Sequence, residues 1–222
     1  MEKELRETLR YLGYRGRTEQ EPETGRQQML ALAEDCLREA RQAARPRCLW
    51  KEQPLQFLED GRLDLGLFQT RSQALAKSLK DCTGVLFFAA TLGAETDRLL
   101  GRYGRLQVSR AVVLQAAAAA VLEAYCDQVF EEKKKEYESR GQFLRPRFSP
   151  GYGDFSLECQ PALLAGLEAG KRIGITLTGR YLMAPSKSVT AAAGISPVPA
   201  GCVTEGCEAC GKTDCAYRRD EA

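Results

Sequence analysis

Hydrophobic and polar positions near the N-terminus have the spacing of two amphipathic helices. The first is expected over residues 3–12 and is stopped by the glycine-containing stretch 13–16. After the polar loop 17–25, Thr24 is the predicted cap of a second helix, which Pro46 ends. Apolar side chains are expected on one face of that helix: Met29, Ala33, Cys36, Leu37, Ala40 and Ala44.

The middle of the chain mixes short strand-like segments with helices. Strands are expected at 48–50, 55–58 and 63–68, and a helix at 72–79. Residues 83–90 (TGVLFFAA) form a continuous apolar run, which predicts a central strand buried on both faces. A short helix follows at 95–100. A long helix at 106–139 carries a stripe made of Leu114, Ala118, Val121, Tyr125 and Val129.

The C-terminal third predicts a loop, a helix and two strands before its composition changes. The loop covers 145–154, the helix runs over 157–169 until Gly170, and strands are expected at 173–178 and 188–195. From residue 197 the chain is rich in Gly, Pro and Cys. Because helices and strands do not alternate one for one, the fold class is α+β. We expect a single domain over 1–196, with a twisted mixed or antiparallel sheet packed with helices, and a Cys-rich tail over 197–222.

Composition excludes several classes of protein. Lys and Arg number 32 against 30 Asp and Glu, so the charge gives no reason to expect nucleic-acid or anionic-membrane binding. The chain has no histidine, which removes Ser-His-Asp and Cys-His catalysis and every His-containing metal site. No signal peptide is visible, and no run approaches the roughly 20 apolar residues of a membrane span. We therefore expect a cytoplasmic protein with reduced thiols.

One loop has the composition of a ligand-binding turn. In Arg147-Phe-Ser149-Pro-Gly151-Tyr152, the glycine allows close approach to the backbone and the tyrosine ring stands beside it. Arg147 offers a fixed charge and a bidentate fork suited to a carboxylate or phosphate. An ordinary surface turn has the same composition, so the alternative stays open on spacing alone.

Two further segments are candidates for the same site. Glu123 follows Ala116, Ala119 and Ala120 in the long helix, so its carboxylate lies near a face of methyl groups that leaves room for a ligand. An exposed glutamate on an alanine-rich helix is the simpler interpretation. The segment 176–189, which includes Thr178, runs from one strand through a proline-broken link into another, and any hairpin has a similar pattern.

Together these pieces resemble the activation domain of cobalamin-dependent methionine synthase and its free-standing bacterial relatives. The family motif is Arg, three residues, then Gly-Tyr, which here spans 147–152. A strand ending in Leu-Thr, an aromatic, Met-x-Pro and Ser-Val follow in family order at 177–189. The resemblance covers roughly residues 80–196. It departs where the family commonly has Leu-Thr-Glu-Ser, because Gly179 and Arg180 replace the last two residues.

The resemblance implies a site for S-adenosylmethionine. Arg147 would pair with the ligand carboxylate, and Ser149, Gly151 and Tyr152 would contact its nucleoside and methionine parts. Glu123 would lie near the cationic amino group, and Thr178 would line the pocket. The implied reaction is reductive methylation, in which cob(II)alamin takes up one electron and the resulting cob(I)alamin accepts the methyl group.

The implied partner is a separate corrinoid protein. The cobalamin would be bound by a methionine synthase or another corrinoid methyltransferase, and a donor such as flavodoxin or ferredoxin would supply the electron. The chain would then be half of an active site, and alone it would show binding with little turnover. Two alternatives stay open: an electron-transfer accessory with a vestigial pocket, and a structural subunit that clamps a corrinoid partner.

The tail carries a second chemical signal. Cys202, Cys207, Cys210 and Cys215 place four thiols within 14 residues, a set that suits tetrahedral zinc or an iron–sulfur cluster. Free thiols in the tail are the alternative. The remaining cysteines are scattered and are expected to be core or surface thiols: Cys36, Cys48, Cys82, Cys126 and Cys159.

Overall fold

The computed structural model describes residues 2–14 and 23–199. These residues are divided between two compact units. Among them, the first unit contains the residues up to Arg45 together with Ala94–Tyr125, and the second contains Pro46–Gly93 and residues 126–199. The four tail cysteines lie outside the described residues, and the domain boundary expected at residue 196 stays a prediction.

The first unit is helical. It contains α1 (Glu2–Tyr11), α2 (Glu23–Ala43), α4 (Ala94–Leu106) and the first part of α5 (Val108–Glu138). The predicted apolar face of α2 is confirmed, since Ala33, Cys36 and Ala40 are fully buried. Burial raises the pKa of the Cys36 thiol to about 11. The helix begins at Glu23, so the prediction that Thr24 caps it is wrong.

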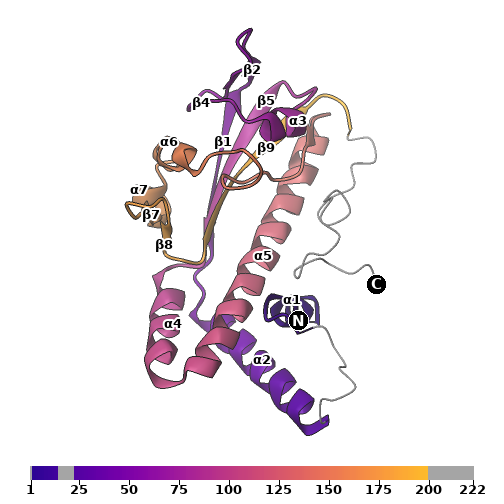
Figure 1. The fold of residues 1–222 in the computed structure, drawn as a ribbon. Helices are drawn as coiled ribbons and strands as arrows, with labels where there is room; N and C mark the ends of the chain where they lie inside the picture. The colour runs from indigo at the N-terminus through magenta and orange to yellow at the C-terminus, as the bar shows by residue number, and fades with distance from the viewer. Residues whose placement is uncertain (1, 15–22, 200–222) are drawn as a thin grey trace. The chain divides into compact units, whose positions relative to one another are not determined.

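The second unit is built on a four-stranded antiparallel sheet in the order β1-β5-β9-β6. Its strands are β1 (Arg47–Pro54), β5 (Gly84–Thr91), β9 (Ser188–Ser196) and the two-residue β6 (Phe143–Leu144). All eight residues of β5 are buried. The strand lies between β1 and β9 in the sheet (Figure 1), which confirms the central strand predicted from its apolar run. The α+β class and the antiparallel sheet are therefore confirmed.

Side chains on the two faces of this sheet enter different apolar clusters. Phe87 and Leu49 point toward one cluster, which also contains residues of the short helices α3 (Gln73–Ser78), α6 (Gln160–Gly166) and α7 (Ala169–Ile173). Leu86 and Ile195 point to the opposite face, where they pack with Phe130 and Tyr137 of α5. The last turns of α5 thus cover one face of the sheet.

Several predicted elements differ from those observed. The helix expected over 157–169 is interrupted, because η1 (Leu157–Cys159) and α6 are followed by Glu168 in the left-handed region at φ 53°. The strand expected over 63–68 is instead β3 (Leu63–Asp64) and β4 (Gln69–Thr70), separated by a turn at Gly66 with φ 75°. The strand expected over 173–178 is reduced to β7 (Thr176–Leu177), which pairs with β8 (Met183–Ala184).

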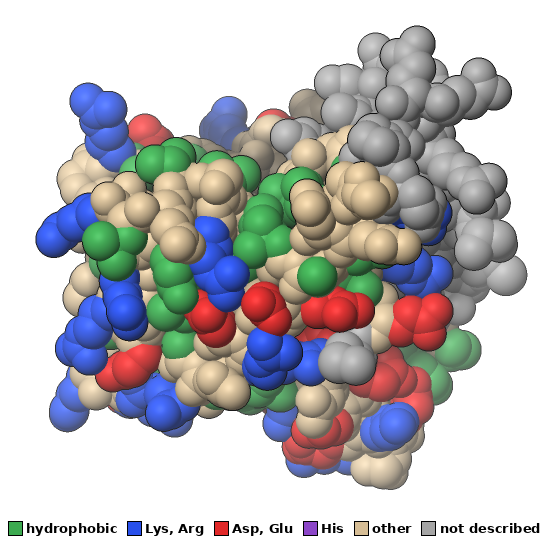
Figure 2. Space-filling view, turned by 90° about the horizontal axis from the view of Figure 1, so that it is seen from below, with side chains coloured by type: hydrophobic (Ala, Val, Ile, Leu, Met, Phe, Trp, Pro, Cys, Tyr) green, Lys and Arg blue, Asp and Glu red, His purple; other side chains and the backbone are tan. Residues whose placement is uncertain are grey.

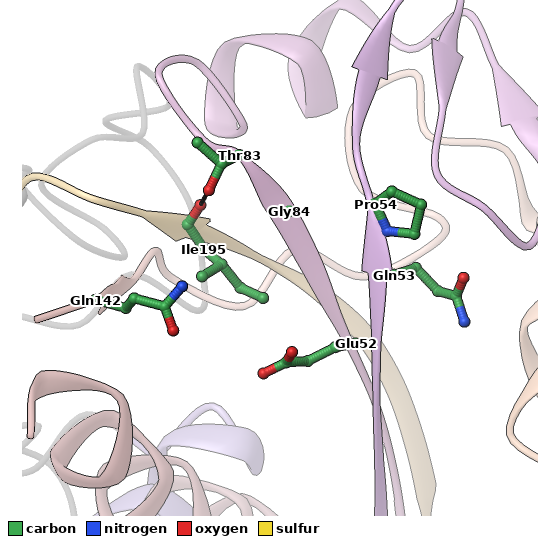
Figure 3. A pocket seen from close by; sticks show the side chains of 7 residues that line it. All are labelled: Glu52, Gln53, Pro54, Thr83, Gly84, Gln142 and Ile195. Carbon is green, nitrogen blue, oxygen red and sulfur yellow. Dashed lines mark hydrogen bonds between the residues drawn. The ribbon is translucent and has the colours of Figure 1, made fainter. Parts of the chain in front are cut away.

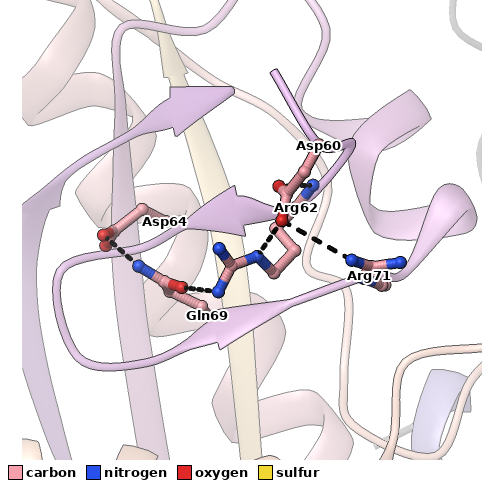
Figure 4. Close-up of polar contacts among 5 residues, drawn as sticks. All are labelled: Asp60, Arg62, Asp64, Gln69 and Arg71. Carbon is pink, nitrogen blue, oxygen red and sulfur yellow. Dashed lines mark hydrogen bonds and ion pairs between the residues drawn. The ribbon is translucent and has the colours of Figure 1, made fainter. Parts of the chain in front are cut away.

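A polar network links side chains of the small sheet formed by β2 (Gln56–Phe57), β3 and β4 (Figure 4). Arg62 donates to Asp60 and to Gln69, and Gln69 donates to Asp64 at 2.9 Å. Backbone N–H groups hold the pKa of both carboxyl groups below the ordinary range, Arg62 acting on Asp60 and Gly66 acting on Asp64. All these groups are solvent-exposed, so the network fixes the conformation of the sheet and adds little stability.

Surface charge and the long helix are relevant to the expected cellular location of the protein. On the face shown in Figure 2, acidic and basic side chains lie next to one another. Helix α5 is long and apolar enough to cross a membrane by length and composition, although 44% of the relevant stretch is buried within the protein. Core helices of soluble proteins share these properties, so this is weak evidence for a membrane span. The cytoplasmic location stays a prediction.

Candidate functional site

The loop predicted to bind a ligand runs along the free side of β9. The backbone N–H of Arg145 donates to the carbonyl of Gly194, and Phe148 and Ala192 exchange two backbone hydrogen bonds of 2.8 and 2.9 Å. The chain from β6 onward therefore continues beside β9 in extended form. Side chains in such a segment alternate between the two faces. Phe148 accordingly packs into the cluster that contains Phe87, whereas Arg147 lies toward α5.

Arg147 has an acidic partner and an aromatic environment. Its Nη2 donates to Oδ1 of Asp127 on α5 at 2.8 Å. The guanidinium carbon lies 5.6 Å from the ring centroid of Phe130 and 6.0 Å from that of Phe88, within cation–π range. Only 18% of the Arg147 side chain is exposed. The arginine is thus held in one orientation beside the sheet.

The remainder of the loop forms a tight turn with an exposed ring. Gly151 has φ 96°, which side-chain-bearing residues rarely adopt, and its N–H donates to the carbonyl of Phe155 at 2.7 Å. Tyr152 lies beyond it with 66% of its surface exposed, and its N–H donates to the carbonyl of Ser149. The Tyr152 ring lies 6.4 Å from the Phe148 ring, centroid to centroid. The N–H groups of Gly151 and Tyr152 are thus used inside the turn, and the exposed Tyr152 ring is the part of it that faces solvent.

A neighbouring aspartate fixes the end of this turn. Asp154 accepts hydrogen bonds from the Ser72 hydroxyl at 2.6 Å and from the backbone N–H groups of Gln73 and Ala74. These donors, the Ser72 hydroxyl first, hold the pKa of the Asp154 carboxyl below its usual range. The loop is thereby attached to the first turn of α3.

Thr178 lies in a separate hairpin. Its hydroxyl accepts the N–H of Leu182 at 3.3 Å, and its backbone closes the turn that joins β7 to β8. The side chains of Leu177 and Met183 pack against the same apolar cluster as Phe148. Thr178 therefore shapes the hairpin, and the structure gives no direct contact between it and the loop that contains Arg147.

Of the six predicted ligand-binding residues, four are brought together because they belong to one loop: Arg147, Ser149, Gly151 and Tyr152. Glu123 lies on α5 within the first unit and is half-buried. It precedes Asp127 by four residues, which is about one helical turn. The role expected for Glu123 stays a prediction.

A hollow of about 350 Å³ lies at the end of the main sheet, away from the predicted residues (Figure 3). The side chains of Glu52 and Gln142 extend into it from β1 and from the segment before β6. The Tyr137 hydroxyl donates to Glu52, and burial together with this carboxylate raises the pKa of Tyr137. The lining is formed by Glu52, Gln53, Pro54, Thr83, Gly84, Gln142 and Ile195.

Sequence reasoning missed three residues that organise the loop. Asp127 could have been noticed from its position one turn after Glu123 on the same helix. Phe148 stands inside the motif, but nothing in the local pattern shows which face of the sheet it enters. Asp154 bonds to a helix about 80 residues earlier, and no local sequence signal predicts such a contact.

The protein thus has an α+β fold in which the last turns of a long helix cover an antiparallel sheet and an Arg-containing loop follows one sheet edge. Among solved structures it is similar to a crystal structure of the MetH reactivation domain bound to AdoHcy, with a TM-score of 0.58. The sequences are 17% identical, and the likeness covers 87% of this chain and 75% of the other. The similarity confirms the fold implied by the sequence resemblance. No family model and no curated protein matches the sequence.

Proposed function

We propose that the protein binds S-adenosylmethionine and supports reductive methylation of cobalamin held by a separate corrinoid protein, such as a methionine synthase. The observation that carries this proposal is the position of the Arg147–Tyr152 loop, which follows the edge of β9 in a fold similar to the MetH reactivation domain. That domain was crystallised with AdoHcy, which supports a ligand of the same chemical class for this chain.

The residues of the loop fit such a ligand chemically. Arg147 can bind the α-carboxylate, because a guanidinium matches a carboxylate in planar, two-pronged geometry. The exposed Tyr152 ring can stack on the adenine, and Gly151 and Ser149 let the backbone approach the ligand closely. We assign Glu123 to the ammonium group and Thr178 to supporting the neighbouring hairpin.

The contribution of this chain to the reaction is positioning. When bound, S-adenosylmethionine supplies the methyl group that the reduced cobalt of the partner accepts. Arg147 and Tyr152 hold the two ends of the ligand so that its sulfonium centre is oriented toward the partner. No residue of the chain has to move a proton, which agrees with the absence of histidine.

Binding can be tested by calorimetric titration with S-adenosylmethionine and S-adenosylhomocysteine. A charge-assisted hydrogen bond contributes about 1.5–3 kcal/mol, so Arg147→Ala should weaken binding roughly 10- to 150-fold. Arg71→Ala is the control, because Arg71 is 72% exposed and pairs only weakly with Asp60 at 3.5 Å. If Arg147→Ala binds both ligands as well as the wild type, the assignment of the site is wrong.

The role in reactivation needs a second experiment. A cobalamin-dependent methionine synthase that lacks its own reactivation domain is prepared in the cob(II) state with S-adenosylmethionine and reduced flavodoxin or ferredoxin. We expect the methylcobalamin absorbance spectrum to develop only when this chain is added. If the protein binds S-adenosylmethionine but the spectrum does not change, the proposed role in reactivation is wrong and only the ligand-binding role stands.

A further inference from the structure

The acidic partner of Arg147 is a second charged group at the proposed ligand site. Asp127 approaches the guanidinium at 2.8 Å, and 41% of its side chain is exposed, compared with 18% for Arg147. The arginine is therefore largely enclosed, whereas the carboxylate keeps a substantial surface toward solvent. A ligand that reaches Arg147 meets both charges.

This pairing changes which ligands the arginine can attract. An isolated guanidinium favours any anion, but a guanidinium beside a carboxylate has no net charge, so a simple anion gains attraction from one group and repulsion from the other. A ligand that carries a positive and a negative group on adjacent atoms avoids this conflict. The head of an α-amino acid is such a ligand.

We infer that Asp127 determines ligand specificity. Its carboxylate accepts a hydrogen bond from the α-ammonium group of a ligand, while the carboxylate of the same ligand binds Arg147. A guanidinium presents five N–H donors in a planar fork and can bind carboxylates along more than one edge, so Asp127 and the ligand can share it. This inference rests on the proposed function and adds that the site selects zwitterionic amino-acid ligands over anionic ones that lack the amino group.

The position of Asp127 on the helix supports this role. It follows Glu123, the residue that we assign to the ammonium group, by one turn of α5. Asp127 also orients Arg147 between Phe88 and Phe130. It thus acts as a positioning residue for the arginine as well as a partner for the ligand.

The test compares two ligands across matched variants. The probes are S-adenosylhomocysteine and its analogue in which hydrogen replaces the amino group, titrated calorimetrically into the full chain. We expect the wild type to prefer the amino form by about tenfold or more, and Asp127→Asn to reduce that preference to about threefold or less. Glu136→Gln is the control, since Glu136 lies on the same helix, is also 41% exposed and pairs with Lys133.

The outcomes separate this inference from the proposed function. If the wild type prefers the amino form and Asp127→Asn keeps the same preference, or weakens both ligands equally, the inference is overturned while the proposed function stands. If the wild type binds neither S-adenosylmethionine nor S-adenosylhomocysteine, the proposed function itself is wrong. Thermal unfolding of each variant checks folding, and Asp127→Glu should restore part of the preference.

Discussion

Among single residues, Asp154 shows how a loop side chain controls the conformation of the site. Its carboxylate satisfies the N–H groups of Gln73 and Ala74 at the start of α3, together with the Ser72 hydroxyl. Ser72 is the N-cap of the same helix, and its side chain accepts the N–H of Leu75 at 3.0 Å. The end of the Arg147–Tyr152 turn therefore depends on a helix from a distant part of the sequence.

This arrangement predicts a pH-dependent contribution to stability. The folded pKa of Asp154 lies below its ordinary value, so its contribution is present above the unfolded pKa of about 3.9 and is lost as the pH falls through the folded pKa. Asp154→Asn should lower the melting temperature at pH 7, and the difference from wild type should be smaller at pH 3, because it declines once the pH falls below the unfolded pKa. An equal difference at both pH values would contradict this account.

The N-cap of α3 gives a second prediction. Ser72→Ala should lower the free energy of unfolding by about 1 kcal/mol, because it removes the side chain that caps this helix.

At the level of elements, the sequence correctly predicted the helices and strands whose own residues carry a clear hydrophobic pattern. The apolar run of β5 and the spacing of α2 and α5 identify these elements without knowledge of their partners. The break between α6 and α7 has no such signal. Glu168 is neither glycine nor proline, and its left-handed conformation allows Ala169 and Ile173 to be buried after a change of direction.

Contacts between distant segments explain the remaining differences. Strand β6 has two residues and exists only because Ser196 and Ile195 pair with it from the other end of the unit. In the same way, the sequence could suggest Arg147 as a ligand-binding residue but could not show that Asp127, twenty residues earlier, is its partner. The candidate loop was thus predictable in part, whereas its electrostatic environment was not.

The crowding around Gly194 in β9 gives a prediction at this scale. A Cβ atom there would lie 2.4 Å from the sulfur of Cys82 and 3.0 Å from Cδ2 of Leu79. Gly194→Ala should therefore destabilise the fold by about 1–3 kcal/mol, measured by urea unfolding, and Cys82→Ala should restore part of the loss. Gly101→Ala in α4 is the matched control. Its Cβ meets nothing within 4 Å, so it should stabilise the helix by about 0.5–1 kcal/mol.

For the whole molecule, the cysteines divide into those of the described residues and those of the tail. Among residues 2–14 and 23–199 no two cysteines form a disulfide with each other, and those at 36 and 126 are buried, as the sequence predicts. The tail set lies outside these residues, and its metal-binding role stays a prediction.

Metal analysis of anaerobically purified protein tests this prediction. We expect zinc or iron in the full chain and its loss when Cys202, Cys207, Cys210 and Cys215 are all replaced by serine. Cys48→Ser should keep the metal, and binding of S-adenosylmethionine should not change in either variant. Metal-free wild-type protein, or full retention of metal in the fourfold variant, would show that the tail holds no metal.

The pairing of β5 with β9 has a consequence for biosynthesis. All eight residues of β5 are buried in the finished protein, yet its partner on one side follows on the order of 100 residues later. At about 5–20 residues per second, a nascent chain exposes this apolar strand for roughly 5–20 s before β9 leaves the ribosome. During that interval the strand is a target for chaperones and for association with other nascent chains.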